Sequence, residues 1–162
     1  MEIREFYDKI ALEYSNASAH PTTATARKLE EELTMHIVTG KRYHTVIDIG
    51  CGDGHFLRSV DAENKIGIDI SVEMIRLNSM HVPQASYVLG CFPDVPLKHN
   101  FIDLAHASFI LDHAKDLGKF FAKTSKLLEL DGQFILTEFN PESMLNFRAH
   151  EEILKYKSLT GQ

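Results

Sequence analysis

Apolar residues recur along the chain with two periods, and each period predicts a different kind of element. Short apolar runs bounded by turn formers are typical of strands with both faces buried. Apolar positions spaced by three or four residues are typical of helices with one apolar face. The predicted strands occupy residues 43–49, 65–70, 85–89, 101–108 and 133–139.

The predicted helices precede, separate and follow these strands. In the helix at about residues 23–38, Leu29, Leu33 and Ile37 share one stripe, which we expect to pack on the domain. Ser71 suits the N-cap of the helix after the second strand. The other helices are predicted at residues 2–15, after the glycine turn to about residue 60, at about 116–130 before an Asp-Gly pair, and at about 143–159.

The first strand runs directly into three glycines, Gly50, Gly52 and Gly54, before a helical pattern restarts at His55. A strand, a glycine turn and a helix present backbone amides to the negative end of a ligand. Glycines allow close approach and positive φ angles. A dinucleotide fingerprint would need a small residue at position 55, so His55 argues against a nicotinamide cofactor.

Two acidic residues accompany the glycines. Asp48 precedes the first glycine by two residues, and Asp69 ends the second strand. The carboxyl ends of neighbouring parallel strands face one crevice, where ligands bind. A carboxylate there can accept both hydroxyl hydrogens of a ribose, and Ser71 leaves Asp69 available because it can cap the helix itself.

The acid-x-G-x-G-x-G pattern, with Asp69 after it, closely resembles the first motif of the class I S-adenosylmethionine (SAM)-dependent methyltransferases. The resemblance spans about residues 5–142. It implies a Rossmann-like three-layer α/β sandwich with a parallel sheet in the order 3-2-1-4-5. It also implies a single domain, with a helical lid at about 1–40, a core at about 41–142 and a C-terminal helix at about 143–162.

By the same resemblance, the chain is expected to be an enzyme of the EC 2.1.1 type that moves a methyl group from SAM to a small-molecule acceptor and releases S-adenosylhomocysteine (SAH). The loop amides would hold the carboxylate end of SAM, and Asp48 would fix the turn or meet the methionine ammonium through water. Asp69 would bind the ribose. The implied cofactor contacts are Tyr14, Asp48, Gly50, Cys51, Gly52, Asp69, Ile70, Met74, Cys91, Phe92 and Ser108.

Around the adenine, the chain departs from the family pattern. The family often places an acid after the third strand to receive the adenine amino group, and here Cys91 stands in its place. Adenine recognition is then expected from backbone groups near Cys91 and Phe92, or from Asp94. Ile70 and Met74 would flank the ring.

The substrate side is expected from two segments. Residues 6–14 resemble the N-terminal segment that closes over the cofactor, so Tyr7 and Tyr14 are candidates for cofactor or substrate contacts. Residues 108–113 resemble the loop that lines the methionine part and the substrate, including Phe109. His113 is the leading candidate to orient or deprotonate the substrate, and an incidental surface or capping role is the alternative. His106, inside the fourth strand, is expected to be a core or crevice residue.

Composition narrows the partners. The 162 residues include 17 basic and 23 acidic ones, for a net charge of -6. This balance argues against nucleic acids and anionic membranes as partners. We expect a cytoplasmic protein, because neither an apolar run of roughly 18 residues nor a signal peptide is evident. The two cysteines are expected to be free thiols, and no metal is expected because no zinc-ligand spacing occurs.

The family usually continues with two further strands, one of them antiparallel, which are missing after the fifth predicted strand. That strand would be an open edge and would invite pairing. A truncated chain, a homodimer or a partner chain would each account for this. The alternative function is therefore a SAM-binding subunit without catalysis of its own, completed by a dimer mate or partner. A dinucleotide oxidoreductase is a third possibility.

Overall fold

A computed structural model describes residues 2–15 and 21–140. Five strands form one sheet in the order β3-β2-β1-β4-β5, and every neighbouring pair is parallel. The predicted strand order and direction are therefore confirmed. The strands are β1 (Tyr43–Ile49), β2 (Ala62–Asp69), β3 (Ser86–Leu89), β4 (Ile102–Ser108) and β5 (Leu128–Thr137).

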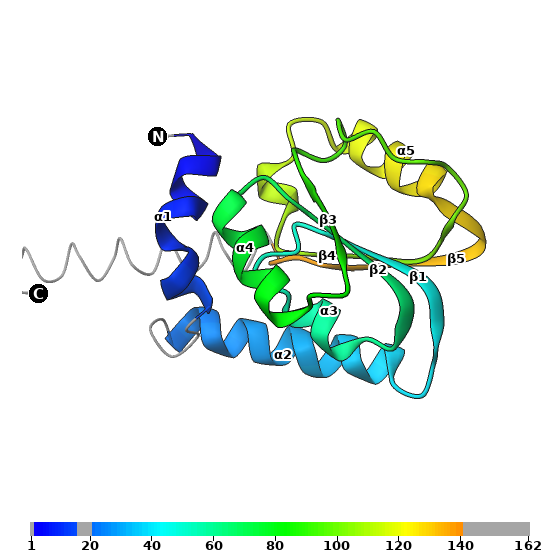
Figure 1. Cartoon of the computed structure of the whole chain (residues 1–162), viewed down its shortest axis with the longest axis horizontal. Coiled ribbons are helices and arrows are strands. Elements are labelled where there is room, and N and C mark those ends of the chain that lie inside the picture. The colour runs from blue at the N-terminus through cyan, green and yellow to red at the C-terminus, as the bar shows by residue number, and fades with distance from the viewer. Residues whose placement is uncertain (1, 16–20, 141–162) are drawn as a thin grey trace, which may run out of the picture.

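Helices cover both faces of the sheet, as the three-layer prediction requires. Figure 1 shows α2 and α3 below the sheet and α5 above it, while α1 stands at one end beside α4. The helix predicted at about 143–159 lies outside the described residues. The helices are α1 (Ile3–Ser15), α2 (Pro21–Val38), α3 (His55–Ser59), α4 (Val72–His81) and α5 (Leu117–Leu127).

Two apolar clusters fill the layers, because side chains alternate between the two faces of each strand. Ile47 and Ile49 of β1 pack with Phe120 of α5 on one face. Val46 of β1 packs with Phe56 of α3 on the other. The central strand is buried on both faces over most of its length, including the polar residues Thr45 and Asp48.

The face of α2 that packs on the sheet is not its apolar stripe, so that prediction is wrong. Glu30, Thr34 and Val38 are buried instead. The reason is polar: Glu30 and Thr34 are hydrogen-bonded to each other, and Glu30 also contacts His106 of β4. The stripe residues are between 44% and 57% exposed: Leu29, Leu33 and Ile37.

The boundary between the last helix and the last strand also differs from the prediction. α5 ends at Leu127 and β5 begins at Leu128, so the expected helix end near residue 130 and strand start at residue 133 are wrong. Helical spacing continues past Leu127 in the sequence. The strand forms nevertheless, because Leu128 pairs with Ile102 and packs against the cluster that contains Phe120.

A bulge in β5 takes up the extra residues. Ile102 lies opposite Leu128 and Leu104 opposite Gln133, so β5 advances farther than β4 between these pairs. Asp131 has a φ of 68°. A Cβ on Gly132 would lie 2.9 Å from the Ile102 carbonyl oxygen. The Asp-Gly pair therefore forms a bulge inside β5 and does not terminate a helix.

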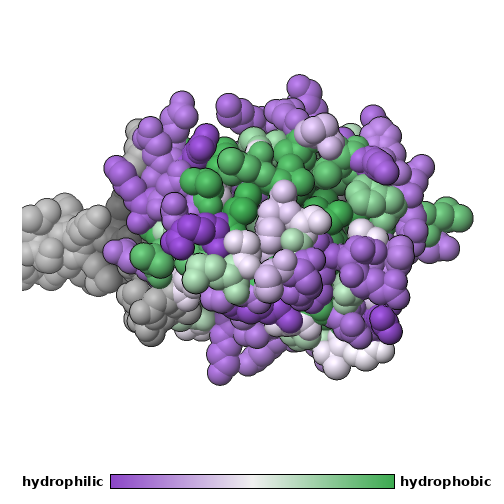
Figure 2. All heavy atoms as spheres, in the orientation of Figure 1, coloured by the Kyte–Doolittle hydropathy of each residue, from purple (hydrophilic) through white to green (hydrophobic). Residues whose placement is uncertain are grey.

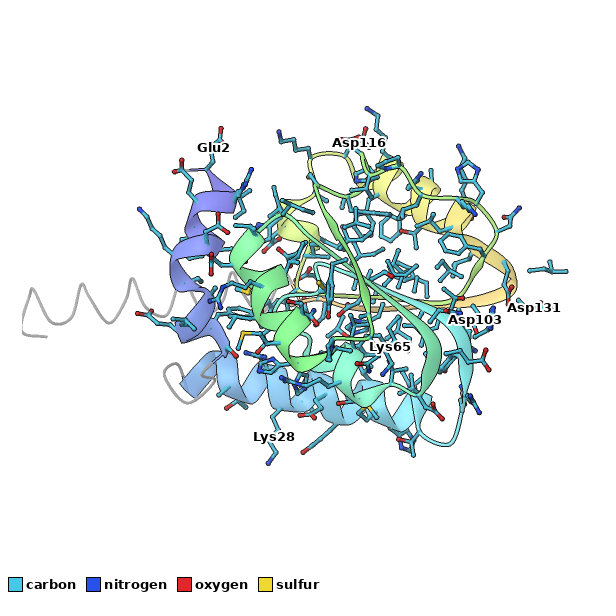
Figure 3. All side chains as sticks on the ribbon, viewed as in Figure 1. Glu2, Lys28, Lys65, Asp103, Asp116 and Asp131 are labelled. Carbon is cyan, nitrogen blue, oxygen red and sulfur yellow. The ribbon has the colours of Figure 1, made fainter. Side chains whose placement is uncertain are left out.

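Two carboxylates fix element starts. The Asp116 side chain accepts the Lys119 N–H at 2.9 Å and caps α5. Asp103, near the start of β4, accepts the N–H groups of His44 and Thr45, each at 2.7 Å. Figure 3 shows Asp103 near Asp131 at the end of the sheet opposite α1. Asp103 therefore ties β4 to β1 at the end remote from the glycine turn.

β5 forms one edge of the sheet, and β3 the other. The side chains of Phe134, Ile135 and Leu136 on β5 are partly exposed. Figure 2 shows hydrophobic residues gathered on the side of the molecule where β3 lies in front, in the region between α4 and α5. Within residues 2–15 and 21–140, no helix is both long and apolar enough to cross a membrane.

Candidate functional site

The turn after β1 has the backbone that its glycines predict. Gly50, Gly52 and Gly54 have φ angles of 76°, 46° and 84°. These angles lie in the left-handed region that side chains disfavour. Gly54 is also needed for space, because a Cβ there would lie 2.2 Å from the Asn78 side-chain oxygen. Asn78 in turn donates to the carbonyl of Cys51 and holds the turn against α4.

Several amides of this turn already have acceptors within the protein. Gly50 and Cys51 both donate to the Ile68 carbonyl, at 2.8 and 2.9 Å, and Gly54 donates to the Cys51 carbonyl at 3.0 Å. The parallel ladder between β1 and β2 continues into the turn and takes up these donors. In this arrangement the glycines supply positive φ and close approach, and the amides of Gly50 and Cys51 are not free for an anion.

Asp69 is fixed at the end of β2 by two backbone amides. Its carboxylate accepts the Gly52 N–H at 2.9 Å and the Ser71 N–H at 2.9 Å. Burial raises the pKa of Asp69 above the usual carboxyl value, although both hydrogen bonds oppose the shift. Ser71 caps α4 by accepting the Met74 N–H, as predicted, so Asp69 is not needed as the cap.

The turn and Asp69 open onto one cavity. Its empty volume is about 790 Å³, which includes its open mouth and the solvent space there. Ile110, Phe120 and Ile3 also line it, which the sequence did not predict. The predicted site residues that line it are Tyr7, Tyr14, Gly50, Gly52, Asp69, Ile70, Met74, Cys91, Phe92, Ser108, Phe109 and His113.

Three predicted candidates lie elsewhere. Asp94 is exposed and does not line this cavity. Cys51 is buried behind the turn, where its sulfur would lie 2.8 Å from a Cβ on Gly67. Burial raises the pKa of the Cys51 thiol well above its usual value. Asp48 is also buried beneath the turn.

Asp48 and Cys51 line a second, smaller cavity of about 450 Å³ that shares Tyr14, Gly52 and Ser108 with the first. Sequence reasoning missed most of its wall. Asp53 lies between two motif glycines and so had a signal in the sequence. Arg27 and Glu30 of α2 had no such signal in the sequence, because charged residues are common on helices. The missed charged or titratable residues of this wall are Arg27, Glu30, Asp53 and His55, whereas His106 is the buried crevice residue that was expected.

Arg27 connects α2 to the turn and to α1. Its guanidinium donates two hydrogen bonds to the Asp53 carboxylate, each at 3.1 Å, and one to the Tyr14 carbonyl at 2.6 Å. It also lies over the Tyr14 ring, 4.9 Å from the centroid. Tyr14, which lines both cavities, is therefore held beside Gly52 from the α2 side.

Tyr7 and His113 meet across the cavity wall. The Tyr7 hydroxyl lies 2.8 Å from His113 Nε2, which joins α1 to the 3₁₀ turn η2 (Leu111–His113). Burial, with Tyr14 and Asp69 nearby, raises the pKa of Tyr7 to about 12. The phenol therefore keeps its proton near neutrality and forms a hydrogen bond with Nε2. The His113 side chain is exposed and also lines the cavity, which is compatible both with the predicted role in orienting or deprotonating a substrate and with the incidental surface or capping role.

The loop after β4 has two further features. Phe109 has a φ of 52°, a strained value for a bulky residue, and its ring stacks on Phe139 at 4.4 Å between centroids. Ser108 lines both cavities, and its buried Oγ has no hydrogen-bond partner within the described part of the chain. Such an orphaned hydroxyl at a cavity wall suits a polar ligand group.

Metal-ligating side chains do not gather in the described ranges. Among residues 2–15 and 21–140, no group of three or more His, Cys, Asp or Glu side chains could hold a metal ion. Cys51 and Cys91 are free cysteines, the first buried and the second exposed.

Comparison with known proteins identifies the sequence family. A family model described as a methyltransferase domain matches residues 47–136. An uncharacterized protein of Methanocaldococcus jannaschii is 31% identical over 143 residues, which is 86% of this chain and 53% of that protein. The malonyl-[acyl-carrier protein] O-methyltransferase of Yersinia pestis is 27% identical over 116 residues, 68% of this chain and 43% of that enzyme. The chain spans about half the length of the first curated relatives that it matches.

Solved structures agree on the fold. A complex of DhpI with SAH superposes with a TM-score of 0.69 at 19% identity, over 85% of this chain and 68% of that one. The methyltransferase in a complex with the Trm112 activator of Haloferax volcanii superposes with a TM-score of 0.64 at 19% identity, over 80% of this chain and 58% of that one. With the matching family model, the glycine turn and the strand order 3-2-1-4-5, the chain belongs to the class I SAM-dependent methyltransferases.

Proposed function

We propose that this chain transfers a methyl group from SAM to a small-molecule acceptor. One observation carries the proposal: Gly52 and Asp69 open onto the same cavity as Tyr7 and His113. A group bound at the turn and a group bound near His113 would share that cavity. The net charge of -6 and the apolar and aromatic lining favour a small acceptor over a nucleic acid.

The described residues fit SAM at three points. Asp69 presents a half-buried carboxylate to the cavity, suited to the two hydroxyls of a ribose. Ile70 and Met74 beside it provide apolar walls for a flat ring, and Cys91 and Phe92 lie on the cavity wall as well. The unpartnered Ser108 hydroxyl supplies a polar contact where the two cavities meet, next to the wall formed by Asp48.

The protein's part in the reaction is positioning and exclusion of water. SAM supplies a methyl group on a positively charged sulfur, which an acceptor displaces in line. Tyr7 and Tyr14 from α1 cover the cavity and limit its contact with water. His113 Nε2 is hydrogen-bonded to the Tyr7 hydroxyl at 2.8 Å. We propose that an acceptor hydroxyl takes the place of the Tyr7 hydroxyl, so that its proton passes to Nε2 as its oxygen gains the methyl group.

A SAM-binding subunit completed by another chain is the second candidate. It is favoured by the edge position of β5 in the described part of the sheet and by the partly exposed apolar side chains of that strand. One structural neighbour is a methyltransferase in a complex with an activator protein. Either a homodimer or a partner chain that covers β5 would complete such a subunit.

Calorimetry with SAH tests the cofactor proposal directly. We expect saturable binding of SAH and no binding of NAD, and the reverse result would favour a dinucleotide enzyme. An assay for SAH release with a panel of small hydroxyl, amine and thiol acceptors then separates the two candidates. Binding without turnover of any acceptor, restored by a second protein, would favour the subunit. Failure to bind SAH would reject both.

A further inference from the structure

A buried charged cluster lies beneath the glycine turn and joins three elements. His106 of β4 is 3% exposed, Asp48 of β1 is 3% exposed and Glu30 of α2 is 8% exposed. His106 Nδ1 lies 2.8 Å from Asp48 Oδ1, and His106 Nε2 lies 3.1 Å from Glu30 Oε1. The His106 ring is also stacked on Phe56 of α3, with 3.9 Å between ring centroids.

The geometry favours a charged ring. Both ring nitrogens of His106 face carboxylate oxygens, and the imidazolium, with its two N–H groups, can donate to both carboxylates at once. Burial alone would lower the pKa of His106, but the charge and hydrogen bond of Asp48, aided by Glu30, raise it to about 9. The side-chain hydrogen bond from His106 also helps to hold the pKa of Glu30 below its usual value, against the effect of burial.

This cluster forms a buried polar contact between α2 and the sheet. The apolar stripe of α2 faces solvent, and the buried face carries Glu30 with Thr34, which donates to Glu30 Oε1 at 3.0 Å. One turn earlier on the same helix, Arg27 binds Asp53 and the Tyr14 carbonyl. The position of α2 on the sheet therefore sets where Tyr14 lies against Gly52.

We propose that His106 is a positioning residue for the cofactor site, which bridges Glu30 and Asp48 and so holds the α2 wall and Tyr14 against the glycine turn. The inference rests on the proposed function. His106 does not line the larger cavity, so it acts through its two carboxylate partners. Its loss weakens cofactor binding and leaves the methyl-transfer step itself unchanged.

Charge-matched variants test the proposal. At neutral pH the cluster of one imidazolium and two carboxylates has a net charge of minus one. His106→Gln leaves two buried carboxylates with one neutral partner, and we expect its Kd for SAH to rise at least about tenfold. The double variant Glu30→Gln/His106→Gln restores the net charge and offers amide hydrogen bonds to Asp48. We expect it to bind SAH within about threefold of the unchanged protein, a loss of under about 1 kcal/mol.

The control is His44→Gln. It makes the same exchange on an exposed side chain of β1 whose ring pairs with Glu63 at the surface, and it should leave the Kd unchanged. Equal Kd values for the unchanged protein and for folded His106→Gln would overturn the proposal. So would a double variant as weak as the single one, because a loss of packing alone is not repaired by matching charge.

Spectroscopy of the unchanged protein keeps the proposal testable if His106→Gln fails to fold. Nitrogen-15 spectra near neutral pH should show both ring nitrogens of His106 protonated and both protons hydrogen-bonded. A neutral ring would overturn the proposal. Failure of the unchanged protein to bind SAH, with the doubly protonated ring present, would reject the proposed function and the positioning role, and would leave His106 as a purely structural bridge.

Discussion

The carboxylate of Asp69 accepts the backbone N–H of Gly52 at 2.9 Å. This bond joins the end of β2 to the turn after β1, the two features that the sequence singled out independently. A second bond, from the Ser71 N–H, fixes the other carboxylate oxygen. The group that we propose to bind the ribose is thus oriented before any ligand arrives.

Removing this carboxylate should weaken cofactor binding without unfolding the chain. We expect Asp69→Ala to reduce the binding free energy of SAH by about 1.5–3 kcal/mol, the scale for hydrogen bonds to a charged group. Calorimetry measures the change. Asp94→Ala, on an exposed side chain outside the cavity, is the control and should bind SAH normally. An unchanged Kd in Asp69→Ala would remove this residue from the site.

His113 should affect turnover more than cofactor affinity. Once an acceptor is known, we expect His113→Ala to lower kcat by about 10²–10⁴, the usual contribution of a positioned base, with the Kd for SAH little changed. Tyr7→Phe removes only the hydroxyl that lies 2.8 Å from Nε2, so it should retain most of kcat. His99→Ala, on an exposed loop residue, controls for loss of a histidine. Normal turnover in His113→Ala would make His113 a bystander.

The His106 bridge predicts a pH dependence of stability. The pKa of His106 in the folded protein is about 9, above the value near 6.5 expected for the unfolded chain. The stabilisation is therefore complete below about pH 6.5 and is lost as pH rises through about 9, with a slope of up to about 1.4 kcal/mol per pH unit. The charged groups that face the ring are Asp48 from β1 and Glu30 from α2.

Urea unfolding across this pH window measures the effect. The free energy of unfolding should fall more steeply with pH in the unchanged protein than in Glu30→Gln/His106→Gln, which lacks the titrating ring but keeps the net charge. All other histidines are common to both proteins, so the difference between the two curves isolates His106. Parallel curves would show that His106 is not protonated in the folded state.

Two glycines with similar backbone angles should differ in their tolerance of a side chain. Gly40 and Gly54 have φ angles of 77° and 84°. A Cβ on Gly40 would meet nothing within 4 Å, whereas one on Gly54 would lie 2.2 Å from the Asn78 side chain. We expect Gly40→Ala to cost about 1 kcal/mol of stability through its φ angle alone. Gly54→Ala should cost a further 1–3 kcal/mol, roughly, for overpacking. Equal losses in urea unfolding would contradict the close packing of the turn on α4.

The orientation of α2 can be tested by two substitutions on opposite faces. Leu33 is 57% exposed and Val38 is 3% exposed. Leu33→Lys should change the free energy of unfolding by less than about 0.5 kcal/mol. Val38→Ala should cost about 2 kcal/mol, for lost burial and a residual cavity. The reverse order would mean that the apolar stripe packs inward, as the sequence alone suggested.

The sequence predicted the backbone of the turn and much of the cavity lining wherever local chemistry determines the backbone. Gly50 and Gly52 predict positive φ angles. The position of Asp69 at the crevice follows from the rule that neighbouring parallel strands end at one crevice. The N-cap at Ser71 is equally local. These features need no knowledge of distant contacts, which explains why the strand order and most of the cavity lining could be anticipated.

The sequence-based predictions differ from the structure where contacts between residues far apart in the sequence determine the local structure. Nothing near Glu30 in the sequence shows that its carboxylate contacts His106. Hydrophobicity alone therefore predicts a buried face of α2 that lies one residue before the face that the structure buries. The same holds for Leu128, whose strand pairing with Ile102 overrides the helical period before it. Amides that looked available at the turn, those of Gly50 and Cys51, are taken up by Ile68 of the neighbouring strand.

The bulge in β5 has a consequence for behaviour at high concentration. Regular hydrogen-bonding spacing is interrupted between Leu128 and Gln133, where Asp131 turns the backbone to a φ of 68°. A strand arriving from another molecule cannot stay in step through such an interruption, and the exposed charges of Glu129 and Asp131 repel it further. A strand from another molecule could therefore add to this edge only along Gln133 to Thr137, and this short stretch disfavours continued edge-to-edge aggregation.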